Sequence, residues 1–204
     1  RSFTYEKAKN DWILQLDADE YISDGLKKNL KNLISSDADI YDISYSLFFK
    51  GKHHFIFLKR ALFRKSKIYF IGVAHDGAEP LNDKIKISKT KYKLFNEPLY
   101  DNFTPSVFQK KWKSWARIHA RQLLEDFRDI PKWNCTLSDW DKRRRLLIKH
   151  PLLLGMVGAT TYKGITFLKL FMKHWKYFII PVGIYSCMYS FYLYYYVWDF
   201  KGKK

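Results

Sequence analysis

Three carboxylates follow a short apolar run near the beginning of the chain. The run from Trp12 to Leu16 is typical of a buried strand, and Asp17, Asp19 and Glu20 come directly after it. Alternation along an extended chain points Asp17 and Asp19 to the same side. Mg²⁺ and Mn²⁺ prefer such oxygen ligands and keep positions open for substrate phosphates. The spacing therefore indicates either a metal and phosphate site or an acidic helix start, where the helix dipole favours Asp and Glu.

An EF-hand calcium loop beginning at Asp17 is excluded by residue spacing. Such a loop needs Asp or Asn, then Gly, then Glu, where this chain has Tyr21, Ile22 and Lys28. All three requirements fail, so this class of calcium site does not account for the carboxylates.

The residues around the acidic motif predict an α/β unit with mixed strand pairing. A helix is expected at 25–34, where leucines recur at helical spacing, with Asp24 as its N-cap. Apolar residues alternate with Asp and Ser from Tyr41 to Phe49, which indicates a strand with one buried face. Further strands are expected at roughly 12–17, 54–63, 68–74 and 85–95.

The second half of the chain is predicted to be helical. Amphipathic spacing predicts a helix at 107–127, and another at 139–149 carries the basic cluster from Lys142 to Arg145. No charged residue occurs from Tyr177 to Trp198, and a helix over this segment would span about 33 Å, enough to cross a bilayer core. Because Tyr and Trp prefer the membrane interface, an interfacial helix or hairpin is favoured over a span. An aromatic helix packed within the protein is the third interpretation.

Composition indicates a folded protein with an anionic partner. The 204 residues are 47% hydrophobic and 19% aromatic, which excludes a disordered chain. The net charge of +17 favours nucleotide phosphates, anionic lipid head groups or a lipid-linked diphosphate. Nucleic acid is not expected, because zinc-finger spacing and aromatic RNA-binding signatures are both missing from the sequence. With two cysteines in dissimilar segments, Cys135 and Cys187, a structural disulfide is not expected either.

The acidic motif and its flanks resemble the signature of family 2 glycosyltransferases with the GT-A fold, closest to the subgroup that builds lipopolysaccharide core and other surface glycans. Residues 8–12 lead into Leu-Asp-Ala-Asp-Glu at 16–20, as in that family. Further matches follow in the family's order at 49–52, 62–65, 72–76 and 98–101. Together they cover about half of the chain. The chain departs from the family at Ser2, where Asn is frequent, and at Asp76, where Glu is common.

The resemblance implies a GT-A-like fold, a Rossmann-like mixed sheet with flanking helices followed by a helical C-terminal region. The family's nucleotide-binding first half would precede residue 1, so the domain is expected to be incomplete at its N-terminus. Three regions follow from this comparison. They are the C-terminal half of a GT-A domain at 1–103, a helical acceptor-side region at 104–150, and an aromatic, membrane-associated helical tail at 151–204.

The resemblance further implies an inverting enzyme that transfers a sugar from a nucleotide-sugar donor to a glycan or lipid-linked acceptor. Asp19 and Asp17 would bind Mg²⁺ or Mn²⁺, and Asp76 would be the catalytic base beside His75, with Glu79 as the fallback. Substrate contacts are expected from Asp17, Glu20, Arg64 and Lys65. The expected location is cytoplasmic, peripheral or anchored at the inner face of the cell membrane.

Two other interpretations of the same residues stay open. The chain could be a nucleotide-sugar-binding module of the same fold without catalysis. It could also be a basic adaptor for a membrane or a nucleic acid, in which case binding would depend steeply on salt and would ignore Asp17 and Asp19.

Overall fold

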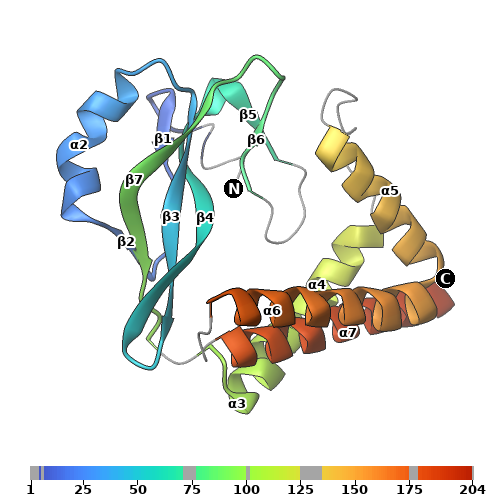
Figure 1. The fold of residues 1–204 in the computed structure, drawn as a ribbon. Coiled ribbons are helices and arrows are strands. Elements are labelled where there is room, and N and C mark those ends of the chain that lie inside the picture. Colours follow the sequence, from blue (N-terminus) through green and yellow to red (C-terminus); the bar gives the residue numbers. More distant parts are fainter. Residues whose placement is uncertain are drawn as a thin grey trace. The chain divides into compact units, whose positions relative to one another are not determined.

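A computed structural model of the chain describes residues 5, 7–70, 77–99, 102–124, 135–174 and 179–203. The described residues divide into two compact units, the first ending at residue 99 and the second beginning at residue 102. Unit 1 is a mixed α/β structure built around a curled sheet, and unit 2 is helical (Figure 1). The predicted mixed α/β class and the helical C-terminal region are therefore confirmed.

The sheet of unit 1 has five strands in the order β1-β4-β3-β7-β2. Only the β3–β7 pair is parallel among the described pairs, and the other neighbours are antiparallel. The strands are β1 (Trp12–Leu14), β2 (Glu20–Ile22), β3 (Ile40–Phe49), β4 (Lys52–Arg64) and β7 (Ile87–Asn96). Short strands β5 (Ile68–Tyr69) and β6 (Glu79–Pro80) form a separate pair, with one 3₁₀ turn, η1 (Lys65–Lys67), before them.

Helix α2 (Asp24–Ile34) packs its leucine face on the sheet. Its buried Leu26 shares a core with Leu94 of β7 and with Tyr41 and Ile43 of β3. The alternation from Tyr41 to Phe49 predicted such a buried face for β3. Ser23 caps the helix, because its hydroxyl accepts the Leu26 N–H at 3.2 Å. The prediction of Asp24 as the cap was wrong by one residue; its carboxylate lies in the first turn, where the helix dipole favours it.

Strands β3 and β4 form a long hairpin that turns at Lys50 and Gly51, both with positive φ. Register shifts interrupt the ladder at Tyr41/Asp42 and at Tyr45/Ser46. Ser46, predicted on the polar face, is fully buried. Its hydroxyl accepts the Asn96 N–H at 3.0 Å and lies 3.1 Å from His53 Nδ1, which satisfies it inside the sheet.

Unit 2 consists of α3 (Pro105–Val107), η2 (Phe108–Trp112), α4 (Lys113–Leu124), α5 (Cys135–Lys149), η3 (Pro151–Ala159), α6 (Thr160–His174) and α7 (Ile179–Gly202). Segments η2 and η3 are π-helical. Ala116, Ala120 and Leu123 of α4 share one core with Leu193 and Val197 of α7. The regions 104–150 and 151–204 are therefore packed together. Within the described residues, no helix has both the length and the apolar character that crossing a bilayer requires.

Candidate active site

The acidic segment lies at the carboxyl end of the parallel strands of unit 1. Strand β1 is antiparallel to β4, which is antiparallel to β3, so β1, β3 and β7 all run in one direction. Asp17 and Asp19 follow the last residue of β1, and Glu20 begins β2 opposite Asn96, the last residue of β7. The Glu97 N–H donates to the Asp19 carbonyl at 2.8 Å. The main chain thus holds the segment where α/β sheets bind ligands.

Lys59 of β4 bridges two of the three carboxylates. Its ammonium donates to both carboxylate oxygens of Glu20 at 2.5 Å and to Asp17 Oδ2 at 3.2 Å. The Glu20 side chain is 1% exposed, that of Lys59 20% and that of Asp17 50%. The Asp17 N–H also donates to Glu20 Oε2 at 3.0 Å. The Lys59 ammonium therefore pairs with the buried Glu20 carboxylate. The Asp17 carboxylate, its second partner, stays half exposed to solvent.

The negative charges of this segment affect the pKa of the Tyr45 phenol. Burial raises the pKa of Tyr45, and Glu20, Asp19 and Asp17 raise it further because their negative charges oppose the phenolate. The Lys59 ammonium lies 5.6 Å from the centre of the Tyr45 ring. All three predicted carboxylates are therefore close enough to one phenol to act on its ionisation.

Asp19 differs from its two neighbours because its carboxylate makes no hydrogen bond or ion pair with the described residues. A carboxylate at this place in the fold, with the main chain fixed and the side chain available, suits a hard divalent cation that keeps other positions for phosphate oxygens. No group of three or more His, Cys, Asp or Glu side chains in the described part of the chain converges as a complete metal cage. The residues fit a cation shared with substrate, bound through Asp19 with Asp17 beside it.

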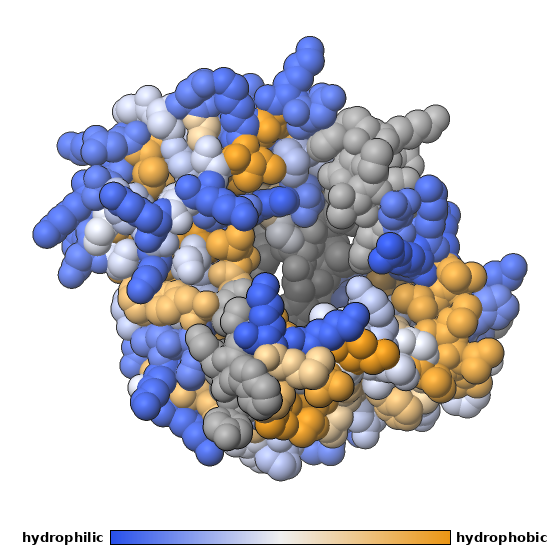
Figure 2. Space-filling model, viewed as in Figure 1, coloured by the Kyte–Doolittle hydropathy of each residue, from blue (hydrophilic) through white to orange (hydrophobic). Residues whose placement is uncertain are grey.

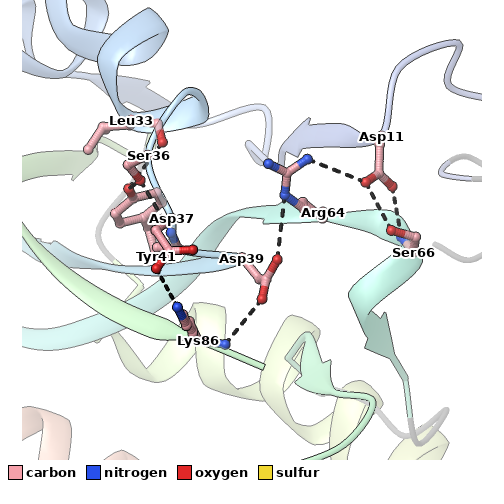
Figure 3. A network of polar contacts seen from close by, with 10 residues as sticks. Asp11, Leu33, Ser36, Asp37, Asp39, Tyr41, Arg64, Ser66 and Lys86 are labelled. Carbon is pink, nitrogen blue, oxygen red and sulfur yellow. Dashed lines mark hydrogen bonds and ion pairs between the residues drawn. The ribbon is translucent and has the colours of Figure 1, made fainter. Parts of the chain in front are cut away.

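Arg64 and Lys65 lie at the other end of β1, because Arg64 pairs with Trp12, the first residue of that strand. The Arg64 guanidinium lies 3.5 Å from Asp39 and 3.8 Å from Asp11, in the network that Figure 3 shows. The Lys65 ammonium donates to the Ala8 carbonyl at 2.6 Å. The structure does not bring these two residues together with Asp17, Asp19 and Glu20, and their described contacts tie loops to the sheet.

The predicted catalytic pair His75 and Asp76 lies outside the described residues. Glu79, the fallback base, lies in β6 and accepts a hydrogen bond from Arg60 Nη1 at 2.8 Å. Arg60 also contacts Asp42 at 3.3 Å, so Glu79 belongs to a charged network. The role of Glu79 as a fallback base stays a prediction.

Sequence reasoning missed Lys59 and Tyr45 as members of the site. The signal for Lys59 was present, because Lys59 and Arg60 interrupt an otherwise apolar strand. A charged residue in the middle of a buried strand needs a partner, and here the partner is Glu20. Tyr45 gave no such signal, since aromatic residues are ordinary in strands.

No protein-family model matches the chain, and no curated protein matches its sequence. The functional assignment therefore depends on the residues and on the geometry described above.

Proposed function

We propose that this chain takes part in inverting, metal-dependent glycosyl transfer that builds cell-surface polysaccharide. Its donor would be a nucleotide sugar and its acceptor a glycan or a lipid-linked sugar. The observation that carries this proposal is the Asp19 carboxylate beyond the carboxyl end of β1, which no described residue pairs, with Asp17 and the Lys59–Glu20 pair beside it. The ordered motifs that resemble family 2 glycosyltransferases supply the reaction class.

The reaction transfers a glycosyl group without a covalent enzyme intermediate. An acceptor hydroxyl oxygen forms a bond to the anomeric carbon as the bond from that carbon to the nucleotide diphosphate breaks. The hydroxyl proton passes to a base, assigned by resemblance to Asp76 with His75 beside it. A divalent cation, when bound, supplies positive charge to the departing diphosphate as a Lewis acid.

The described residues have separate tasks in this scheme. Asp19 and Asp17 hold the cation. Lys59 holds the Glu20 carboxylate in place, and Glu20 in turn accepts the Asp17 N–H, so the pair positions the proposed metal-binding segment. Tyr45 is a neutral phenol at physiological pH, and burial and the carboxylates raise its pKa still further above that range.

A stripe along α7 favours a membrane surface as a partner. Ile180, Ile184, Phe191, Tyr195 and Trp198 are exposed and recur at spacings that place them on one side of the helix. This α7 stripe is uncharged and about 27 Å long at 1.5 Å per residue. Lys201 and Lys203 follow it. Figure 2 shows hydrophobic residues gathered over the helices of unit 2.

An apolar stripe with aromatic residues and adjacent lysines is the pattern of a helix that lies in the interface of an anionic bilayer. The net charge of +17 also favours binding to an anionic bilayer. We therefore place the protein peripherally at the inner face of the cell membrane, where lipid-linked acceptors and cytoplasmic nucleotide sugars meet.

A transfer assay with matched aspartate variants tests the proposed reaction. The protein is incubated with radiolabelled UDP- and GDP-sugars, Mn²⁺ and glycan or lipid-linked acceptors, and the transferred label is counted. Asp19→Asn should lower transfer by about a hundredfold or more, as loss of one transition-state charge contact does. Asp83→Asn, at an exposed position in a loop, should keep full activity. Equal transfer by wild type and Asp19→Asn would refute the assignment.

A further inference from the structure

Unit 2 contains a cavity of about 520 Å³ that the proposed sugar transfer does not use. Its walls come from α4, α5, η3, α6 and α7, which all belong to this unit. Leu123, Leu147, Leu154 and Leu193 supply most of the apolar lining. The volume lies within the range of about 300–1,000 Å³ that small-molecule sites occupy. The cavity is therefore large enough for an alkyl chain of moderate length.

Cationic side chains from separate helices line this space, Arg143 as an exposed residue and Lys163 as a partly buried one. Lys163 of α6 and Arg143 of α5 both line it, and neither makes an ion pair with any residue that the structure describes. Burial lowers the pKa of Lys163, because its ammonium is partly removed from water without a counter-ion. Arg144, by contrast, is neutralised by Asp141 at 2.7 Å. The cavity thus holds positive charge that is not balanced from within the described part of the protein.

Two polar groups meet near Lys163. Its ammonium lies 5.7 Å from the ring centre of Tyr189, and the Tyr189 hydroxyl is 3.1 Å from His119 Nδ1. His119 also lines the cavity. An anion bound here would meet a cation and a hydrogen-bonding imidazole, each from a helix that packs on α7.

Apolar side chains border the cavity at the surface, beside the exposed Arg143. Leu146 and Tyr162 line it and are 52% and 67% exposed. Leu153 and Val157, neighbours of the lining residues in η3, are also exposed. The cavity is thus bordered by surface that favours hydrocarbon over water.

We infer that this cavity binds a single-chain anionic amphiphile, with the hydrocarbon chain against the leucines and the acidic head group at Lys163 and Arg143. A nucleotide fits less well, because its base and sugar need several polar partners and seven of the fourteen lining residues are leucine, glycine or alanine. A neutral hydrocarbon would leave the Lys163 ammonium unbalanced. The apolar walls match the hydrocarbon chain of an amphiphile, and the few charged groups match its acidic head group.

Calorimetric titration of the whole chain tests this inference. The probes are decyl phosphate, decanoate and 1-decanol, each below its micelle concentration, so that phosphate and carboxylate heads are compared with an uncharged one. Both anions should bind at one site at least about tenfold more tightly than the alcohol, since a charge-assisted contact contributes that much. Preference between the two anions identifies the head group.

Three variants distinguish binding in the cavity from general electrostatic attraction to a basic protein. Lys163→Met keeps the length of the side chain and removes its charge, and it should weaken anion binding about tenfold. Lys169→Met, on the same helix but outside the cavity lining, should have no effect. Gly158→Leu places a side chain where the nearest other atom is 3.8 Å away at the cavity border, and it should reduce binding of all three probes.

Equal loss in the Lys163 and Lys169 variants, or equal affinity for anions and alcohol, would overturn the inference. The outcome is independent of the proposed sugar transfer, because Asp19→Asn should leave amphiphile binding unchanged.

Discussion

At the scale of single residues, the three neighbouring carboxylates of the candidate site differ in burial and in pairing. Glu20 is buried and paired, Asp17 is half exposed and shares the same lysine, and Asp19 is unpaired among the described residues. Burying a charge costs several kcal/mol unless it is paired. Lys59 therefore supplies the buried Glu20 carboxylate with the ion pair that offsets this cost.

Removing Lys59 should destabilise unit 1. Lys59→Met leaves the Glu20 carboxylate unpaired with 1% exposure, so we expect a loss of about 2–3 kcal/mol, the range for a hydrogen bond to a charged group. Urea unfolding of the variant measures this loss. The double variant Lys59→Met/Glu20→Gln should recover part of it, because the uncompensated charge is gone.

Lys84→Met, at an exposed loop position, is the control for this experiment and should be neutral. A Lys59→Met variant as stable as this control would mean that the pair contributes nothing to folding.

The stability of unit 2 should fall in acid through Asp141. Burial alone would raise the pKa of this carboxyl, but hydrogen bonds from Arg145 and Arg144 outweigh it and the pKa is lowered. The unfolded state then takes up the proton first, so the stabilisation is complete above about pH 4 and is lost as the pH falls through the folded-state value.

Urea unfolding from pH 6 to pH 2 measures this dependence. Asp141→Asn should be less stable at pH 6 and should depend less on pH than the wild type. Parallel pH profiles for the two proteins would exclude Asp141 as a source of acid sensitivity.

The sequence predicted that the acidic residues come directly after the end of a strand. Their pairing was not predictable. Lys59 lies 39 residues from Glu20, and which residue of β4 reaches it depends on the register shifts in the β3–β4 hairpin. A shift of one residue would turn a different side chain to that face.

At the scale of elements, unit 2 depends on two close approaches between helices. A Cβ atom added at Gly155 would lie 2.6 Å from the Tyr194 ring, and one at Gly183 would lie 2.9 Å from Phe167 Cβ. Both contacts are shorter than packed carbon atoms allow, so glycine lets η3 and α6 pack directly on α7. The sequence shows the glycines, but it does not show which aromatic residue lies against each of them.

Alanine at these glycines should destabilise the helical unit. Gly183→Ala and Gly155→Ala force neighbouring side chains to move, which typically costs about 1–3 kcal/mol. Gly164→Ala is the matched control, because its Cβ would meet only Cys187 Sγ at 3.7 Å. That variant should be stabilised by up to about 1 kcal/mol, since alanine is the better helix former.

Thermal unfolding of the three glycine variants, followed by circular dichroism, shows whether each substitution raises or lowers the unfolding midpoint. If Gly183→Ala and Gly164→Ala shift the midpoint in the same direction, the packing described for α6 and α7 is wrong.

Helix and strand positions were largely predictable because hydrophobic periodicity is a local property. The strand at 41–49 and the helix at 25–34 agree with β3 and α2 within one residue at each end. The π-helical segments η2 and η3 were not predictable. The wider turn of a π-helix has no signature in the hydrophobic pattern.

At the scale of the whole molecule, the chain combines a large positive charge with an exposed apolar stripe. The charge of +17 was evident from composition. For the tail, the sequence left an interfacial helix, a span and a packed helix as alternatives. The structure shows α7 packed in unit 2 on one side, through residues such as Leu193 and Val197, and exposed along the α7 stripe on the other.

Substitutions in the α7 stripe should weaken binding to anionic vesicles. Phe191→Ser and Trp198→Ser each remove an exposed aromatic side chain, 42% and 46% exposed, that would enter the interface. Each should lower the partition coefficient by about tenfold, given roughly 25 cal/mol per Å² of apolar surface buried. Flotation with phosphatidylglycerol vesicles at several salt concentrations measures this.

Leu81→Ser is the control for vesicle binding, because Leu81 is 48% exposed but lies in unit 1. It should bind like the wild type. If all three variants bind equally, membrane binding does not use α7.

The most direct test of the central claim is calorimetric titration of UDP and GDP into the whole chain with Mn²⁺ and with chelator. The double variant Asp17→Asn/Asp19→Asn and the control Asp83→Asn are titrated in parallel. We predict nucleotide binding that requires Mn²⁺, disappears in the double variant and persists in Asp83→Asn. Nucleotide binding that survives chelation and the double substitution, or no binding by the wild type, would contradict a metal-assisted nucleotide-sugar site at Asp17 and Asp19.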